Sequence, residues 1–158
     1  MDLISVIGLT GFLGSALVTL ARAAIDDWRS GMVHDKVFVA GAGLMAFFGF
    51  MYGGLAFLGS MVGLGALAFL VGALSVVAGA MYGADVWALM IYSVSALALN
   101  MPMMLISYAV VTPVYRIFYE RKFEGSEREE DGEGIRILPA FLLAWILGAI
   151  MTSVVGAL

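Results

Sequence analysis

A single carboxylate stands alone in the apolar middle of this chain. Between Val37 and Tyr115, Asp85 is the only Asp, Glu, Lys or Arg. An ionised side chain at membrane depth costs about 2.5 kcal/mol or more on insertion scales, and such residues are usually functional. Asp85 could hydrogen-bond a neighbouring helix in its protonated form, or it could act in chemistry with a second carboxylate.

The candidates for that second carboxylate are the neighbours Asp26 and Asp27, which follow the first apolar run. Two carboxylates that lie close together cannot both ionise cheaply, so one holds a proton near neutral pH while the other stays charged. The charged group can take a proton from water, and the protonated group can polarise a peptide carbonyl and then help the amine to leave. Such a pair would hydrolyse a peptide bond. Because successive helix positions lie about 100° apart, only one of the two neighbours can point at Asp85.

The composition is that of an integral membrane protein. Of the 158 residues, 63% are apolar, and the mean hydropathy is +1.03. The chain has no cysteine and a single histidine, His34, so we expect neither a metal nor another cofactor. The net charge of −4 reflects an acidic run between Glu124 and Glu133 and argues against a nucleic-acid partner. We expect an all-α, polytopic protein whose main surroundings are the lipid bilayer.

Six apolar segments predict the helices of a single transmembrane domain over residues 1–158. They are Leu3–Ile25, Val37–Leu55, Leu58–Ala80, Asp85–Leu99, Met103–Phe118 and a last helix from Leu138 to the C-terminus. The first segment is long enough for a bilayer, so we expect a retained helix rather than a cleaved signal. A turn at Gly59 and Ser60 should separate the second helix from the third. Residues 119–137 should form a polar, acidic cytoplasmic loop.

The segment from Asp85 to Phe118 leaves two alternatives for the number of crossings. Every Lys and Arg lies within residues 22–36 or 116–136. A single helix would give five crossings and put these two basic stretches on opposite sides of the membrane. A break near Asn100 and Pro102 gives six crossings and puts both on one side. Since basic loops favour the cytoplasm, we prefer six, with both carboxylate sites near the cytoplasmic face of a cell membrane.

Two short motifs resemble those of a known family. The segment Asp27-Trp28-Arg29-Ser30-Gly31-Met32-Val33-His34-Asp35 resembles the Asp-x-Arg/Lys-x-x-x-Val/Ile-Pro-Asn/Asp sequence that ends the first helix of type IV prepilin peptidases and archaeal preflagellin peptidases. The segment Tyr82-Gly83-Ala84-Asp85 resembles the second aspartate motif of that family, which is related to the Gly-x-Gly-Asp motif of presenilin-like proteases. The resemblance maps the catalytic aspartates onto Asp27 and Asp85, and the supporting positions onto Arg29, Gly83 and Ala84.

The resemblance implies a membrane-embedded aspartic endopeptidase that works without a cofactor. Its substrates would be prepilin-like or preflagellin-like proteins, from which it removes a short basic leader, the class III signal peptide, on the cytoplasmic side. Arg29 could pair with Asp27 or serve as a cytoplasmic anchor. The sequence departs from the family pattern at three positions, where the family usually has Pro, Gly and Lys: His34, Tyr82 and Trp87.

Two other functions remain open on the sequence. Pro139-Ala140-Phe141 loosely resembles the Pro-Ala-Leu segment of presenilin-like proteases, which cut within transmembrane helices, although the spacing from Asp27 to Val33 does not fit that family. A small ion-coupled or proton-coupled transporter could instead bind its cation at Asp85. A transporter of this kind would have no requirement for Asp27.

Overall fold

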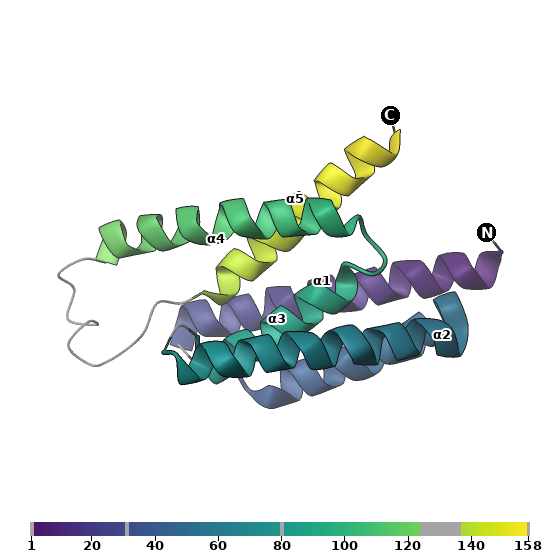
Figure 1. Cartoon of the computed structure of the whole chain (residues 1–158), viewed down its shortest axis with the longest axis horizontal. Coiled ribbons are helices and arrows are strands. Elements are labelled where there is room, and N and C mark those ends of the chain that lie inside the picture. Colours follow the sequence, from purple (N-terminus) through teal and green to yellow (C-terminus); the bar gives the residue numbers. More distant parts are fainter. Residues whose placement is uncertain (1, 31, 80, 124–136, 158) are drawn as a thin grey trace.

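Helices make up nearly all of the part of the chain that the structure describes. The computed structural model describes residues 2–30, 32–79, 81–123 and 137–157. Within those ranges it contains no strand, and the prediction of an all-α protein is confirmed (Figure 1). The helices are α1 (Leu3–Ser30), α2 (Asp35–Val77), α3 (Gly83–Ser95), α4 (Met101–Phe123) and α5 (Leu138–Ala157).

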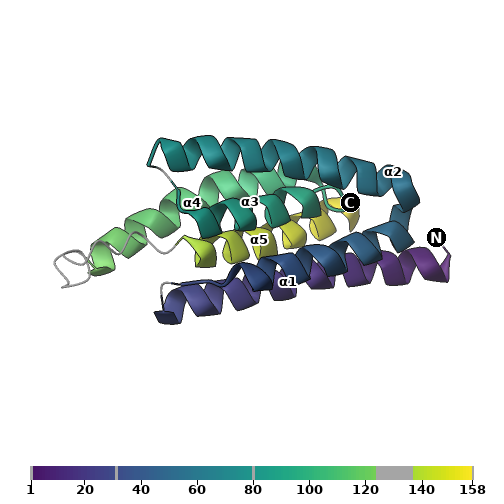
Figure 2. The same ribbon diagram turned by 90° about the horizontal axis from the view of Figure 1, so that it is seen from below.

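The long helix α2 consists of two arms joined at a glycine. Gly54 has φ 64° and ψ −154°, a backbone conformation that is essentially restricted to glycine. The arms on either side of it run antiparallel and diverge from the kink, so that α3 lies between them toward their other ends (Figure 2). Gly49 and Met61 face each other across the arms, since a Cβ at Gly49 would lie 2.8 Å from the Met61 sulfur. The predicted turn at Gly59 and Ser60 is wrong, because both residues continue the second arm and the chain reverses at Gly54.

The chain does break between α3 and α4, as the alternative with six crossings requires. α3 ends at Ser95 and α4 begins at Met101. Asn100 stabilises the break because its side-chain oxygen accepts a hydrogen bond from the N–H of Met103 at 3.3 Å. The Asn100 N–H donates to the hydroxyl of Thr152 on α5 at 3.2 Å. This turn is therefore fastened to the last helix.

Two helices extend further than the sequence indicated. α1 continues past Ile25 to Ser30, which places Asp27 inside the helix rather than in a loop. α4 continues past Phe118 to Phe123, so residues 119–123 are helical and the predicted loop over 119–137 begins too early. The acidic residues of that loop, 124–136, lie outside the described residues.

In the described chain, four helices are long and apolar enough to cross a membrane. They are α1, α2, α4 and α5, whose most apolar windows have mean hydropathies from 1.3 to 2.2. α3 has 13 residues, about 20 Å of helix at 1.5 Å per residue, and is shorter than a ~30 Å hydrocarbon core. Large apolar side chains such as Leu55, Val62 and Leu105 are exposed on the outer surface. The chain is therefore a membrane-embedded helical protein.

Small residues allow the helices to approach closely. A Cβ at Gly8 of α1 would lie 2.5 Å from the backbone nitrogen of Tyr52, near the end of the first arm of α2. Gly41 likewise makes room for Thr19 of α1. Such contacts favour association where no hydrophobic effect drives helices together. The core between the helices is filled by Phe12, Leu20, Phe38, Met45, Met104, Phe141 and Trp145.

The order of the helices gathers several of their ends at one end of the bundle, called the site end below. α1 finishes there and α2 begins there; α2 also returns there before α3 starts (Figure 2). α4 finishes and α5 begins at the same end (Figures 1 and 2). The kink at Gly54 and the turn between α3 and α4 lie at the opposite end. Loops that are far apart in the sequence thus share the site end.

Candidate active site

Asp27 lies on the buried face of α1, close to the site end. The residue is 8% exposed. Leu20, Ala23 and Ala24 are buried on the same helix, and their separation from Asp27 by three, four or seven residues is that of one helix face. The structure therefore places Asp27 among the packed helices.

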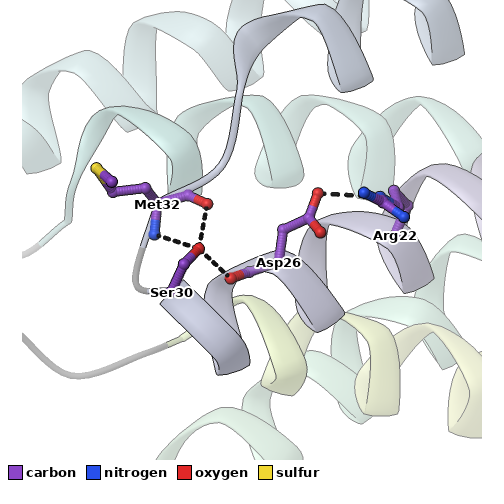
Figure 3. Close-up of polar contacts among 4 residues, drawn as sticks. All are labelled: Arg22, Asp26, Ser30 and Met32. Carbon is purple, nitrogen blue, oxygen red and sulfur yellow. Dashed lines mark hydrogen bonds and ion pairs between the residues drawn. The ribbon is translucent and has the colours of Figure 1, made fainter.

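Asp26 points away from this face and serves the end of the helix. Its Oδ2 forms an ion pair with Nε of Arg22 at 3.0 Å (Figure 3). The Ser30 hydroxyl donates to the Asp26 carbonyl at 2.8 Å and lies 3.4 Å from the N–H of Met32, which donates to it (Figure 3). Asp26 therefore belongs to the polar end of α1. Its exposed ion pair contributes only about 0–1 kcal/mol to the stability of the protein.

The other residues of the first motif lie in or beside the turn that leads to α2. Arg29 is exposed in the last turn of α1, and its two predicted roles, as a partner of Asp27 or as an anchor, both stay predictions. Val33 packs against the core, whereas His34 is exposed at the N-cap of α2.

Asp85 is buried in the first turn of α3, where only 3% of it is exposed. Its Oδ2 accepts a hydrogen bond from the N–H of Tyr82 at 2.9 Å, and its own N–H donates to the Tyr82 carbonyl at 3.0 Å. The N–H groups and the dipole at a helix N-terminus favour a negative charge there. These bonds fix the position of the carboxylate. Tyr82 contacts only Oδ2, and Oδ1 accepts no hydrogen bond from Tyr82.

The two residues before Asp85 have different surroundings. Gly83 is exposed, and a Cβ at this position would meet no atom within 4 Å. Ala84 is half-buried and packs against the core. The backbone of the second motif is therefore open on the side of Gly83.

The first turns of α3 are held by both arms of α2. Trp87 stacks on Phe38 of the first arm, with ring centroids 6.2 Å apart and planes inclined by 10°. Gly72 of the second arm faces Val86, whose Cγ1 would lie 2.8 Å from a Cβ at residue 72. Trp87 therefore has a packing role of its own in this chain.

The structure brings the two predicted catalytic carboxylates to the same end of the bundle. α1 and α3 are in contact, and the C-terminal end of α1 and the N-terminal end of α3 both lie at the site end (Figure 2). Asp27 and Asp85 are both buried there. Arg29 and Gly83 lie at the surface of the same end. Within the described residues, no group of three His, Cys, Asp or Glu side chains could hold a metal ion.

Sequence analysis did not single out Tyr108 on α4, whose side chain is half-buried and packs against the core. Its ring packs against Tyr92 and Phe141, at centroid distances of 5.6 Å and 5.4 Å. A tyrosine is ordinary in a transmembrane helix, so the sequence offers no signal that distinguishes this one.

Comparison of the chain with protein-family models, with curated proteins and with solved structures finds no match.

Proposed function

We propose that the chain is a membrane-embedded aspartic endopeptidase that removes the basic leader from prepilin-like or preflagellin-like proteins. The observation that carries this proposal is the burial of Asp27 and Asp85 at one end of the bundle. Asp27 and Asp85 are also the positions that correspond to the catalytic aspartates in the two motifs described above. A second buried acid at the same end of the bundle is costly for a purely structural role in a membrane, because each charge must be desolvated.

In this mechanism the two aspartates divide the work of an acid and a base. The ionised carboxylate removes a proton from water while the water oxygen bonds to the scissile carbonyl carbon. The protonated carboxyl donates a hydrogen bond to the carbonyl oxygen and then transfers its proton to the departing amine nitrogen. The hydrogen bond from Tyr82 to Asp85 keeps one of the two groups in place through these steps.

The proposal includes six membrane crossings: α1, the two arms of α2, α3, α4 and α5. Along this path the described parts of both basic stretches, within residues 22–36 and 116–123, lie on the side of the site end (Figure 2). Because basic loops favour the cytoplasm, the site faces the cytoplasm of a cell membrane. The short helix α3 completes its crossing with the turn that follows Ser95 and with local thinning of the bilayer.

The substrate in this proposal is a protein with a basic leader directly before an apolar helix. The acidic run between Glu124 and Glu133 supplies opposite charge for such a leader. The apolar helix would lie beside the enzyme in the membrane, where exposed small residues allow close approach.

The test is cleavage of a prepilin-type substrate by the purified protein in liposomes. Asp27→Asn and Asp85→Asn should each lower the rate by on the order of 10³-fold or more, as removal of one member of a catalytic unit does. Asp26→Asn is the matched control: it is the same substitution one residue away, on the exposed ion pair, and it should leave the rate unchanged.

The outcomes separate the alternatives. Cuts within the substrate's transmembrane helix, mapped by mass spectrometry, would favour a presenilin-like protease. Cation uptake into vesicles that needs Asp85 but tolerates Asp27→Asn would favour a transporter. Absence of cleavage across several prepilin-type substrates would contradict the proposed peptidase.

A further inference from the structure

The side of α4 that faces the other helices is lined by hydroxyl groups. Its buried and half-buried positions recur at the spacing of one helix face. From residue 107 onward all of them except Val111 carry a hydroxyl: Ser107, Tyr108, Thr112, Tyr115 and Tyr119. The exposed positions in between carry none, and they include Val110, Val114 and Phe118. α4 therefore turns an apolar side outward and a row of hydroxyl groups, called the hydroxyl face below, toward the bundle.

The usual roles of hydroxyl groups in transmembrane helices do not explain the whole row. Tyrosines that anchor a helix at the membrane surface lie at the level of the headgroups, whereas the tyrosines of α4 are turned inward. Hydroxyl groups also join helices, and Ser107 does so with Tyr92 of α3. The backbone of α4, however, is in close contact only with that of α5 in the described chain. From Leu138 to Leu147, α5 has no side chain with a hydroxyl or a charge. Packing against α5 therefore does not require the hydroxyl face.

One side of α3 faces α4, and Asp85 lies on that side. The hydroxyl of Tyr92 on α3 donates to the carbonyl of Met104 and lies 2.9 Å from the Ser107 hydroxyl, both on α4. Tyr92 therefore points at α4. Asp85 precedes Tyr92 by seven residues, which is two turns of helix, so the two residues share one side of α3. The buried carboxylate and the hydroxyl face thus lie on the facing sides of two helices.

The hydroxyl face also reaches the depth of Asp85. From Tyr92 to Asp85 is a distance of about 10 Å toward the site end, at 1.5 Å per residue. α3 and α4 run in opposite directions (Figures 1 and 2). The same distance along α4 leads from its contacts with Tyr92, at residues 104 and 107, to residues 111–114. Thr112 and Tyr115 are therefore the hydroxyl-bearing residues of α4 at the level of Asp85.

We propose that the hydroxyl face lines an aqueous passage that brings the hydrolytic water from the site end to the aspartates. This inference rests on the proposed peptidase function, in which each cut consumes one water molecule. The hydrocarbon core of a bilayer holds no water, so the water has to enter from the site end. Tyr119 is the hydroxyl residue of α4 nearest to that end, and Tyr115 and Thr112 follow one turn apart. Each hydroxyl can both donate a hydrogen bond to water and accept one from it.

The passage ends where three rings pack together. Tyr108 lies one turn beyond Thr112, and its ring contacts those of Tyr92 and Phe141 at centroid distances of 5.6 Å and 5.4 Å. Tyr92 and Phe141 also contact each other, at 6.2 Å. Aromatic rings from α3, α4 and α5 thus close the space between these helices beyond the level of Asp85. Water would enter as far as the carboxylate and no further.

The first test is chemical labelling, which does not depend on cleavage. The native chain has no cysteine, so a single introduced one is the only thiol. Thr112→Cys probes the hydroxyl face, and Val114→Cys is the matched control, two residues away on the exposed side of α4. The probe is a charged, membrane-impermeant thiosulfonate, present on both sides of liposomes. Because it reacts with the thiolate, and a thiol in apolar surroundings forms little thiolate, Thr112→Cys should be labelled about tenfold faster or more than Val114→Cys. Equal rates would overturn the passage.

The second test removes both hydroxyl groups at the level of Asp85. The double variant Thr112→Val, Tyr115→Phe keeps the bulk of both side chains. One hydrogen bond is worth a factor of about two to ten in rate, so we expect kcat to fall by about fivefold or more with KM unchanged. Thr10→Val, Tyr52→Phe is the matched control, because it removes the same two hydroxyl groups in the other half of the bundle (Figure 1). It should leave kcat unchanged.

The results distinguish a wrong passage from a wrong function. If cleavage requires both aspartates while Thr112→Cys is labelled no faster than Val114→Cys, the peptidase stands and the passage is overturned. A double variant that keeps the native kcat, or that changes only KM, also overturns the passage, and the second result would assign the hydroxyl face to the substrate peptide. Fast labelling of Thr112→Cys in a protein that cleaves no substrate would confirm a water-filled passage and overturn the peptidase.

Discussion

Gly72 sets how closely the second arm of α2 approaches the first turn of α3. A Cβ at this position would lie 2.8, 3.1 and 3.2 Å from Cγ1, Cγ2 and Cβ of Val86, the residue that follows Asp85. Carbon atoms in contact are about 3.5–4.0 Å apart, so Gly72→Ala would require the two helices to separate by about 0.7–1.2 Å at this point. Val86 cannot simply turn aside, because a β-branched side chain in a helix has one strongly preferred rotamer.

The displacement should pass directly to Asp85. A misplacement of about 1 Å can cost a factor of about 10² in rate, so we expect kcat to fall by about 10–100-fold in Gly72→Ala. Overpacking costs typically about 1–3 kcal/mol of stability, which should also lower the midpoint of thermal unfolding. Both quantities are measurable on the purified protein in detergent, with a prepilin-type substrate for the rate.

Two further variants make the reasoning specific. Gly63→Ala lies on the same arm of α2, where a Cβ meets no atom within 4 Å; it should leave the rate unchanged and should not lower the stability, because alanine favours a helix more than glycine does. Adding Val86→Ala to Gly72→Ala removes both Cγ atoms and should restore most of the rate. A Gly72→Ala protein with native kcat and lowered stability would refute the argument that this contact positions Asp85. Native values of both would show that the contact is not tight.

Two other positions give predictions about stability. Gly54→Ala should lower the unfolding midpoint, because a backbone conformation with φ 64° and ψ −154° costs a residue other than glycine on the order of 1–3 kcal/mol. Gly59→Ala is the control, because Gly59 is helical and a Cβ there meets no atom within 4 Å. Equal midpoints for the two variants would argue against a reversal at Gly54. Trp87→Lys should lower the midpoint more than Trp87→Phe, because lysine loses the aromatic contact with Phe38, which is worth about 0.5–1.5 kcal/mol beyond its buried area. A lysine variant as stable as the native protein would contradict this packing role.

The sequence revealed the helices well because charge and apolar length are read directly from it. Apart from Asp2 and Asp85, charged residues are confined to two stretches, so the apolar segments between them were visible. The break before Pro102 was visible too, since proline and asparagine favour helix ends. The reversal at Gly54 was not, because a chain with 20 glycines offers many possible turns. The choice among them depends on packing between the arms, such as that of Gly49 against Met61.

The candidate site likewise has features that the sequence predicts and features that it does not. Motif spacing selected Asp27 over Asp26, and burial falls on the same residue because α1 continues as a helix to Ser30. The partner of Trp87 and the position of Tyr108 could not be predicted, because both depend on contacts between helices that are distant in the sequence. The sequence around Phe38 and Phe141 does not indicate that their rings contact Trp87 and Tyr108.

The hydrogen bonds of α3 have a consequence for how the protein is made. The Tyr92 hydroxyl bonds to groups of α4, and the indole N–H of Trp145 on α5 donates to the Ser95 hydroxyl at 2.8 Å. During synthesis, α3 leaves the ribosome before either partner exists. The Ser95 hydroxyl also donates to the Tyr92 carbonyl within α3 at 2.7 Å, whereas the Tyr92 hydroxyl gains its bonds only when α4 arrives. The final third of the polypeptide thus completes the burial of the short helix that carries Asp85.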